Sequence, residues 1–422
     1  MGTRNWAGNV TFRAARVESP SSIDELRALV TAHRRVRVVG SGHSFSAIAD
    51  TDGLLLSLAG LPRIIELDTG NTENTDRPAV WVDGGIRYSQ LCRQLDDLGY
   101  ALHNLGSLPH ISVAGSIATG THGSGDANGN LATAVSALEI VTADGDLVEL
   151  SRERDGDLFA GAVVALGSLG VVTRLRLDVR PTFDVRQQVY EDLAFDTVLE
   201  RFDDIFGSAY SVSAFTPWRR RAIDLLWLKR HAADPWDPHE PAFGARPADG
   251  PRHPVPGMPT EACTDQLGAA GPWYARLPHF RPDFTPSVGD ELQSEYLIPR
   301  RHATSALREL AGIRDRIAPA LQVCEIRTMA GDELWTSPSH GRPTVGLHFT
   351  WVPDEATVLP VVTAIEERLA PFEARPHWGK LFTVAPETVR SRYPRIDDFA
   401  GLARRFDPDG KFRNDFVDRY VF

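Results

Sequence analysis

Two glycine-rich segments limit what this chain can fold into. The first, Val38-Val39-Gly40-Ser41-Gly42-His43-Ser44-Phe45, follows a short apolar stretch, and the second extends from Gly106 to Gly125 and is rich in serine and threonine. Glycines expose backbone N–H groups that can bind a diphosphate, because no side chain holds the ligand away. The first segment therefore predicts a strand, a phosphate-binding turn and a helix. The second predicts a stretch that wraps an extended polar ligand.

Both segments have alternative interpretations. A nicotinamide-dinucleotide fingerprint would have a third glycine where Phe45 stands, and no clear acidic residue at the end of a strand follows at the distance that would bind the ribose. His43 also adds bulk where such a fingerprint needs a close backbone approach. A lone histidine in a glycine turn is commonly a hydrogen-bonding surface residue, and the Gly106 to Gly125 stretch taken alone could be a flexible loop.

Composition excludes several function classes. The chain has 422 residues, of which 42% are apolar, so it can bury a large core and form two domains. Its 56 acidic and 45 basic residues give a net charge of −11, which argues against binding to nucleic acid or to an anionic membrane. Cys92, Cys263 and Cys324 are too far apart in sequence to form the C-x-x-C motif of a zinc site or a redox dithiol. No apolar run approaches membrane-spanning length, so we expect a cytoplasmic protein. The net charge is consistent with a monomer, which we also expect.

The first 180 residues read as mixed helices and strands. A Ser-Ser-x-Asp cap begins a predicted helix, and a hairpin is predicted around Asp144-Gly145. The predicted helices are Ser22 to Ala32 and Tyr88 to Leu98, and the predicted strands are Val36 to Val39, Ala79 to Val82, Leu138 to Leu150 and Val171 to Val179. The composition of His110 to Asn130 does not predict a packed helix. A domain boundary is expected near Pro181.

After Phe183 the pattern changes to longer alternating strands. These are Ser294 to Ile298, Cys324 to Met329 and Thr344 to Trp351, with helices at His302 to Ile317 and Ala356 to Leu369. The pattern predicts an antiparallel sheet with helices on one side, and so an α+β fold class. The stretch Ala232 to Pro256, rich in proline, histidine, aspartate and glycine, predicts a long loop or lid.

Several polar residues alternate on the predicted strands of the second part. Glu325 and Arg327 fall on one strand face, and His348 and Thr350 do the same on another strand. An ordinary ion pair and an ordinary polar sheet face are the alternatives. Lys380 is one of only three lysines, with Lys229 and Lys411, in a chain whose other cationic residues are all arginine. Either the chemistry requires a compact point charge at this position or the lysine stands there by chance.

Together these segments resemble the alditol oxidases, in the sugar and polyol branch of the vanillyl-alcohol-oxidase-type FAD enzymes. The resemblance runs from Asn5-Trp6-Ala7-Gly8-Asn9 through both glycine-rich segments to His377-Trp378-Gly379-Lys380 and the tail from Asp407 to Asn414. It implies an FAD-binding domain of two α+β subdomains over residues 1–180, completed by about 381–422. It further implies a substrate-binding cap domain with an antiparallel sheet over residues 181–380.

The resemblance also implies the cofactor and its contacts. His43 takes the place of a histidine joined covalently to the 8α-methyl of FAD, and no cysteine in the second segment offers another link. Gly106 stands where a small residue admits oxygen to the flavin. The other implied FAD contacts are Gly40, Ser41, Gly42 and Ser44 at the diphosphate, Ser107, Ser112, Gly115, Thr119, Gly120, Thr121 and His122 along the ribityl chain and ring, Val172 near the adenine, and His377. No metal is expected.

The implied reaction is oxidation of the terminal hydroxyl of a polyol such as xylitol or sorbitol. Hydride would pass to flavin N5, and O₂ would then reoxidise the flavin and be released as H₂O₂. The implied substrate-binding residues are Ser107, Glu325, Arg327, His348, Thr350 and Lys380. Arg327 and Lys380 would stabilise developing negative charge, and either His348 or Glu325 would accept the hydroxyl proton.

Three other functions stay open on the sequence. An aldonolactone oxidase or dehydrogenase of the same superfamily would share the first glycine-rich segment, the Glu-x-Arg strand and the tail. A flavin-binding protein without turnover is disfavoured by the clustered polar residues of the cap. A nicotinamide dehydrogenase is the third alternative.

Overall fold

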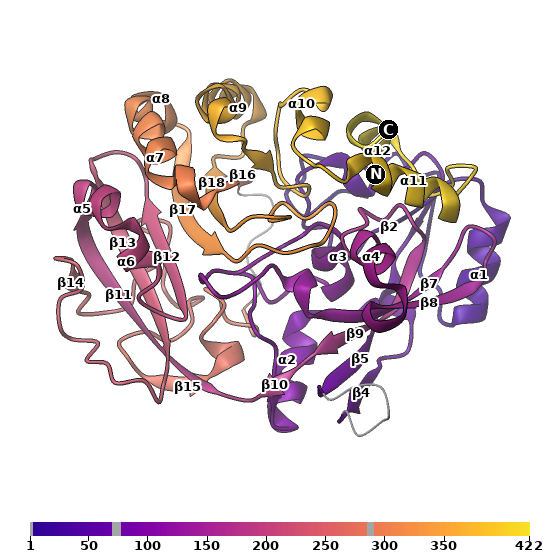
Figure 1. Cartoon of the computed structure of the whole chain (residues 1–422), viewed down its shortest axis with the longest axis horizontal. Helices are drawn as coiled ribbons and strands as arrows, with labels where there is room; N and C mark the ends of the chain where they lie inside the picture. Colours follow the sequence, from indigo (N-terminus) through magenta and orange to yellow (C-terminus); the bar gives the residue numbers. More distant parts are fainter. Residues whose placement is uncertain (1–2, 70–76, 285–290) are drawn as a thin grey trace.

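The computed structural model describes residues 3–69, 77–284 and 291–422 and shows two halves side by side (Figure 1). The first half begins with a small parallel sheet of β1 (Arg16–Glu18), β3 (Leu54–Leu56) and β2 (Val36–Val38). Against it packs α1 (Ile23–Ala32), which begins where the Ser22 side chain accepts a hydrogen bond from the Glu25 amide. Since β2 leads straight into Gly40, this packing positions the first glycine-rich segment.

A second, antiparallel sheet completes the first half. Its strand order is β4 (Ile65–Asp68), β5 (Ala79–Asp83), β9 (Val171–Asp178), β7 (Val135–Val141) and β8 (Leu147–Ser151). Its core is shared with α2 (Tyr88–Asp97), α3 (Val113–Ala118) and α4 (Arg152–Val163). The short strands β6 (Tyr100–Ala101) and β10 (Arg180–Pro181) pair where the chain leaves this half.

The second half is built on one large antiparallel sheet. Its strand order, among the described residues, is β14 (Arg246–Pro247), β11 (Asp184–Ala194), β13 (Ala222–His231), β12 (Ser211–Thr216), β17 (Leu321–Met329), β18 (Thr344–Trp351), β16 (Leu292–Pro299) and β19 (Arg375–Pro376), with β15 (Ala270–Pro272) beside β11. Side chains alternate between its faces. One face is apolar and carries Cys324, Ile326 and Leu347, whereas the other carries Glu325 and Arg327.

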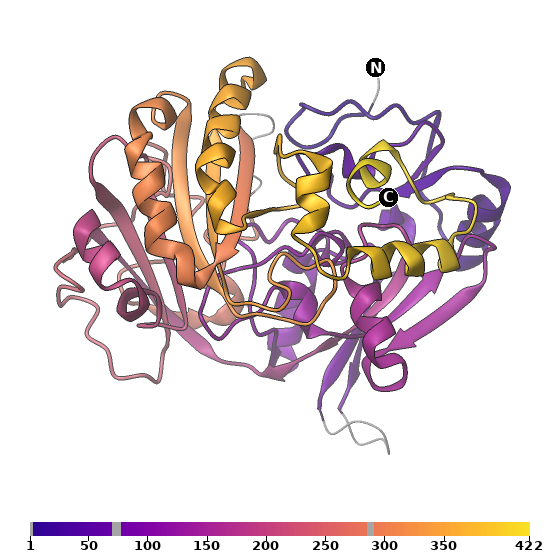
Figure 2. The ribbon, with the colours of Figure 1, turned by 45° about the horizontal axis from the view of Figure 1, so that its top comes forward.

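The helices of the second half cover the apolar face of this sheet (Figure 2). They are α5 (Phe195–Glu200), α6 (Phe202–Phe206), α7 (Ala303–Gly312), α8 (Arg314–Ile317) and α9 (Glu355–Leu369). Residues such as Leu307 and Ile365 are fully buried against the strands. The polar face of the sheet is therefore turned toward the first half of the molecule.

The end of the chain returns to the first half. It forms α10 (Pro386–Ser391), α11 (Ile396–Phe406) and α12 (Asp415–Tyr420), whose buried Val389, Phe399 and Val417 join the core of the second sheet (Figure 2). The buried Arg37 side chain donates hydrogen bonds to the carbonyls of Gly167 and Phe412, among others. These bonds hold the tail against the strand that precedes the first glycine-rich segment.

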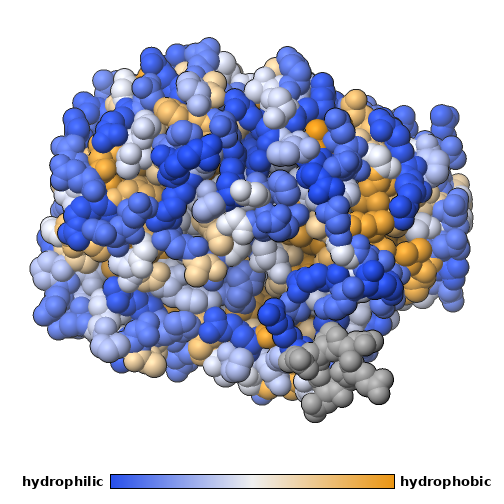
Figure 3. Space-filling view, in the orientation of Figure 1, coloured by the Kyte–Doolittle hydropathy of each residue, from blue (hydrophilic) through white to orange (hydrophobic). Residues whose placement is uncertain are grey.

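Charged and polar side chains cover most of the molecular face shown in Figure 3. Among the described residues, none of the helices is long and apolar enough to cross a membrane. All three cysteines are buried free thiols.

The α+β fold class and most predicted elements are confirmed, including the Ser22 cap, the hairpin around Asp144-Gly145 and the antiparallel sheet of the second half. Three expectations were incomplete. The predicted helix His302 to Ile317 is divided at Ile313 into α7 and α8. The glycine-rich stretch that predicted no packed helix contains α3, whose small residues let a helix turn approach Gly40 closely, since an added Cβ on Gly40 would lie 2.0 Å from Ser112 Oγ. The predicted loop Ala232 to Pro256 contains the short strand β14.

Candidate active site

The two glycine-rich segments lie next to each other and both line one cavity. A Cβ added to Gly40 would lie 2.0 Å from Ser112 Oγ, and one added to Gly115 would lie 2.6 Å from the same atom. Gly42 has a φ of +69°, which a residue with a side chain adopts only under strain. The close approach of the two segments thus depends on the glycine at position 40, while Gly42 allows the turn and Gly115 leaves room for the Ser112 side chain.

The first segment is fastened by residues from both ends of the chain. The amide of Trp6 donates to the Gly42 carbonyl at 2.7 Å, and the amide of Phe45 donates to the Gly379 carbonyl at 2.7 Å. Ser46 Oγ donates to the Trp378 carbonyl, also at 2.7 Å. The turn that carries Lys380 is thereby fixed beside His43.

His43 lies at the meeting point of these segments. Its Nε2 is buried and has no hydrogen-bond partner in the part of the chain that the structure describes, and its ring centroid lies 4.4 Å from that of Trp6. Burial, with Lys380 nearby, lowers the pKa of His43 to about 3, so the imidazole is neutral at neutral pH. His43 lines a large cavity, and a neutral imidazole in the wall of a cavity is suited to bond with a ligand.

The cavity lies between the two halves and has a volume of about 990 Å³. Its walls include nearly all the residues that the sequence analysis singled out. They are Gly40, Ser41, Gly42, His43, Ser44, Gly106, Ser107, Ser112, Gly115, Thr119, Thr121, His122, Val172, Glu325, Arg327, His348, Thr350, His377 and Lys380. Gly120 is not in the wall. Its φ is +67°, and an added Cβ would lie 2.8 Å from Pro338 Cδ, so Gly120 serves the turn.

The polar face of the large sheet supplies one side of the cavity. Glu295 on β16, His348 on β18 and Glu325 on β17 are direct cross-strand neighbours, so they form one row across the sheet. Gln293 and Thr350 form part of the adjacent row. Directly paired residues project from the same face, which is why side chains distant in sequence converge here.

Arg327 joins the carboxylates of this row. Its Nη2 donates to Glu295 Oε1 at 2.7 Å, and its Nε lies 3.6 Å from Glu325 Oε2. Burial alone would raise the pKa of both carboxyls, but Arg327 together with the neighbouring histidines, His122 at Glu295 and His279 at Glu325, outweighs burial and holds both pKa values below their ordinary range. Both groups are thus carboxylates at neutral pH, and His122 Nε2 lies 3.2 Å from Glu295 Oε1.

Lys380 and His348 share one acceptor, the side-chain oxygen of Gln293. Lys380 Nζ donates to Gln293 Oε1, and His348 Nε2 lies 3.1 Å from the same atom. An amide oxygen only accepts hydrogen bonds, so the His348 proton is on Nε2, and Nδ1 is the nitrogen that can accept a proton. Burial lowers the pKa of Lys380 to about 8, against the opposing effect of Glu295.

Sequence reasoning missed three residues at this site. Gln293 and Glu295 lie on β16 in the same alternation that indicated Glu325 and Arg327, so period-two patterning could have found them. His279 lines the cavity from an irregular segment, and its Nε2 lies 2.8 Å from Glu325 Oε1. Local sequence carries no signal for His279, because only the tertiary fold brings it to Glu325.

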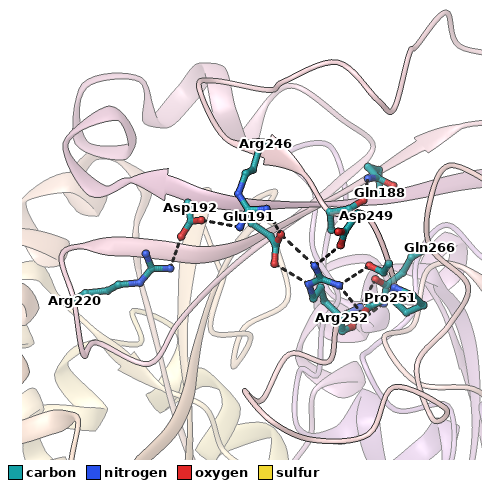
Figure 4. A network of polar contacts seen from close by, with 11 residues as sticks. Gln188, Glu191, Asp192, Arg220, Arg246, Asp249, Pro251, Arg252 and Gln266 are labelled. Atoms are coloured by element: carbon teal, nitrogen blue, oxygen red, sulfur yellow. Dashed lines mark hydrogen bonds and ion pairs between the residues drawn. The ribbon is translucent and has the colours of Figure 1, made fainter.

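An irregular segment, residues 253–262, forms the outer wall of the cavity, and the charged network in Figure 4 anchors it. Arg252 donates from Nε to Glu191 Oε1 at 2.7 Å and from Nη2 to Asp249 Oδ1 at 2.8 Å. Arg246 also contacts Glu191, at 3.0 Å. Two arginines thus hold the segment that precedes the wall against β11.

Comparison with known proteins assigns the chemistry of this cavity. Residues 14–151 match the family model of the FAD binding domain, and residues 290–420 match that of D-arabinono-1,4-lactone oxidase. The cholesterol oxidase of B. sterolicum has the same fold, with a TM-score of 0.79 and 14% identity over 99% of this chain and 96% of that one. The glycine contacts and the unpartnered His43 fit this cofactor. The protein is therefore a flavin-dependent oxidoreductase with the vanillyl-alcohol-oxidase-type fold, and its cofactor is FAD.

Relatives that align over nearly their whole length show to which family of oxidoreductases the chain belongs. The chain is 52% identical to an alditol oxidase from Streptomyces sp. (strain IKD472 / FERM P-14339), over 98% of this chain and 97% of the relative. It is 31% identical to an L-gulono-1,4-lactone dehydrogenase of Mycobacterium tuberculosis, over 99% and 98%. It is 26% identical to the L-gulonolactone oxidase of Mus musculus, again over 99% and 98%. The chain belongs to the alditol oxidase family.

The contact between Gly40 and Ser112 generates a testable prediction. Gly40→Ala puts a methyl on Ser112 Oγ, displaces the loop and weakens FAD retention by about tenfold, roughly the loss of one or two backbone hydrogen bonds. The ratio of flavin to protein absorbance after purification measures this. Gly401→Ala is the matched control, because a Cβ added there would meet no atom within 4 Å and Gly401 lies outside the cavity wall. Gly40→Ala combined with Ser112→Gly should regain the flavin, and a flavin-free double variant would contradict the steric explanation.

Proposed function

We propose that this enzyme oxidises the terminal hydroxyl of an open-chain polyol to the aldehyde, with O₂ as the electron acceptor and H₂O₂ as the second product. The observation that carries the proposal is the row of Glu295, His348 and Glu325 with Arg327 and Lys380 in the wall of the FAD cavity. Such a row offers several charged and neutral partners for a ligand with several hydroxyls. The 52% identity to an alditol oxidase supports the same substrate class.

In this proposal His43, which lines the cavity, holds FAD by a single covalent bond. The backbone around Gly40 and Gly42 binds the diphosphate, and the 106–125 stretch lies along the rest of the cofactor. When bound, FAD supplies the acceptor for the hydride and passes the electrons to O₂. We also propose that residues 1–180 with about 381–422 form the FAD-binding domain and that residues 181–380 form the cap.

The residues of the large sheet prepare the substrate hydroxyl. Arg327 and Lys380 stabilise the negative charge that develops on its oxygen, and His348 accepts its proton at Nδ1. The contacts favour His348 over Glu325 for this step, since the Nδ1 lone pair is free of the Gln293 bond whereas the two Glu325 oxygens already contact His279 and Arg327. His348 is itself neutral, because burial lowers its pKa to about 3.

Selectivity for a polyol follows from the remaining polar groups. Ser107, Glu325 and Thr350 bind the second and third hydroxyls of the substrate. A simple alcohol would leave these buried groups without partners, at a cost of about 1 to 3 kcal/mol for each one. Ethanol-like substrates should therefore react poorly.

An aldonolactone is the second candidate substrate, because residues 290–420 match a lactone oxidase family model. The 31% and 26% identities to lactone enzymes, against 52% to an alditol oxidase, favour the polyol. A lactone also presents fewer free hydroxyls to the charged row.

Anaerobic titration tests the substrate class. Adding xylitol to the yellow holoenzyme without oxygen should bleach the flavin, and readmitting air should restore the colour with one H₂O₂ for each xylitol oxidised. L-gulono-1,4-lactone and ethanol are the comparison substrates, and both should bleach it at least about tenfold more slowly. Rapid bleaching by the lactone with none by xylitol would overturn the proposal.

Acid precipitation tests the bond through His43. The precipitated protein should keep its yellow colour, whereas the supernatant of a His43→Ala preparation should carry the flavin. His110→Ala is the matched control, since His110 lies in the second glycine-rich segment and its Nε2 hydrogen-bonds to the Pro282 carbonyl. A His43→Ala pellet that stays yellow would show that another residue carries the bond.

Lys380 should set the alkaline limit of activity. Because burial lowers its pKa to about 8, the ammonium form is present below that pH and is lost as the pH rises through it. The kcat/KM for xylitol should thus fall above about pH 8, and Lys380→Met should lower it about a hundredfold at pH 7 with little loss of stability. Lys380→Arg should retain the charge at higher pH. A Lys380→Met enzyme with a normal kcat/KM would contradict this role.

A further inference from the structure

A second buried lysine lies on the polar face of the large sheet. Lys229 is on β13 and is 1% exposed. It is the direct neighbour of Ser211 on β12, and Phe215 on that strand is the direct neighbour of Glu325. Lys229 therefore projects from the same face as Glu325 and toward the cavity side of the sheet.

The ammonium group of Lys229 has three donors and three acceptors. Nζ donates to the carbonyl oxygens of Leu277 and Pro278, and it lies 3.3 Å from His279 Nδ1. Burial lowers the pKa of Lys229 to about 7, against the opposing charge of Glu325. Burying such a group is costly unless its hydrogen bonds are satisfied, and here the irregular segment 277–279 satisfies all of them.

This contact fixes the proton of His279. The ammonium form of Lys229, which prevails below about pH 7, has no lone pair, so His279 Nδ1 accepts and the ring proton is on Nε2, where the Glu325 carboxylate can only accept. Burial lowers the pKa of His279 to about 4, which keeps the ring neutral. The Nε2–H then donates to Glu325 Oε1 at 2.8 Å.

The same segment also contacts the first half of the molecule. The amides of His279 and Phe280 both donate to the Ser107 carbonyl, at 3.1 and 3.3 Å. Glu325 and Ser107 come from opposite walls of the cavity, and both belong to the proposed set of groups that bind substrate hydroxyls. The segment 277–280 therefore links these two walls through its hydrogen bonds.

We propose that Lys229 and His279 are positioning residues for polyol binding, in which Lys229 fixes the His279 tautomer and His279 orients the Glu325 carboxylate toward the substrate. Neither residue acts on the reacting carbon. Their effect is to hold Glu325 in the orientation in which it contacts Arg327, so that it can accept a hydrogen bond from a second hydroxyl. The inference rests on the proposed function, because it concerns how that substrate is recognised.

Paired substitutions of His279 provide the first test. In His279→Gln the amide nitrogen can occupy the Nε2 position and keep donating to Glu325, whereas in His279→Asn the side chain is too short to reach it. We expect KM for xylitol within about threefold of wild type for Gln and about tenfold or more higher for Asn, with a smaller change in kcat. Equal KM values for the two variants would overturn the proposal.

A double-substitution cycle provides the second test. Lys229→Met alone should raise KM for xylitol about tenfold, but it should add little to His279→Gln, because the tautomer no longer matters there. If Lys229 only supported the fold, the two effects would add. Additive effects on KM would therefore refute action through His279.

Thr264→Val is the matched control. Thr264 Oγ1 donates to the Pro278 carbonyl at 2.8 Å, lies 3.3 Å from the His279 carbonyl and is equally buried, but its hydrogen bonds do not include the His279 ring or Glu325. It should lower the unfolding temperature while KM for xylitol stays near wild type. All variants are measured as holoenzymes with flavin content and unfolding temperature recorded. Wild-type enzyme that fails to oxidise xylitol refutes the proposed function, whereas active wild type with an unchanged Lys229→Met KM refutes this inference alone.

Discussion

Arg327 between two buried carboxylates is the interaction on which the active site depends. Glu295 and Glu325 are both almost completely buried, and isolated carboxylates in that position would take up protons or destabilise the fold. The guanidinium keeps both charged only while β16, β17 and β18 stay in their register. A slip of one residue would turn all these groups toward the apolar helices. Packing of the apolar face against the helices thus keeps the strands in register, and the polar face carries the residues that line the cavity.

The cavity is formed by contacts between segments far apart in sequence. The 44–46 turn bonds to 378–379, Ser107 bonds to 279–280, and the Gly125 amide donates to the Thr328 carbonyl at 2.9 Å. Each of these bonds joins the first half to the second. The FAD-binding wall and the polar sheet face therefore have a fixed separation, which is a precondition for placing a hydroxyl against the cofactor.

Much of this site could be predicted from sequence because its signals are local. Glycines that need close approach stand in recognisable runs, Glu325 and Arg327 follow strand alternation, and Lys380 stands out among arginines. Gln293 and Glu295 follow the same alternation, but it does not show which residues they contact, and His279 has no local signal. Their roles arise from cross-strand register and from an irregular segment, and both are set by tertiary packing. Lys229 had the same sequence signal as Lys380, but only its three acceptors show what it contacts.

The return of residues 378–414 to the first half has a consequence for folding. The Phe45 amide bonds to Gly379, and the Arg37 side chain donates to the carbonyl of Phe412. These contacts join positions far apart in sequence, so the segment around His43 reaches its final form only after residues 379 and 412 have been synthesised and have folded back. A chain truncated before Gly379 would therefore lack the contacts that hold this segment in place.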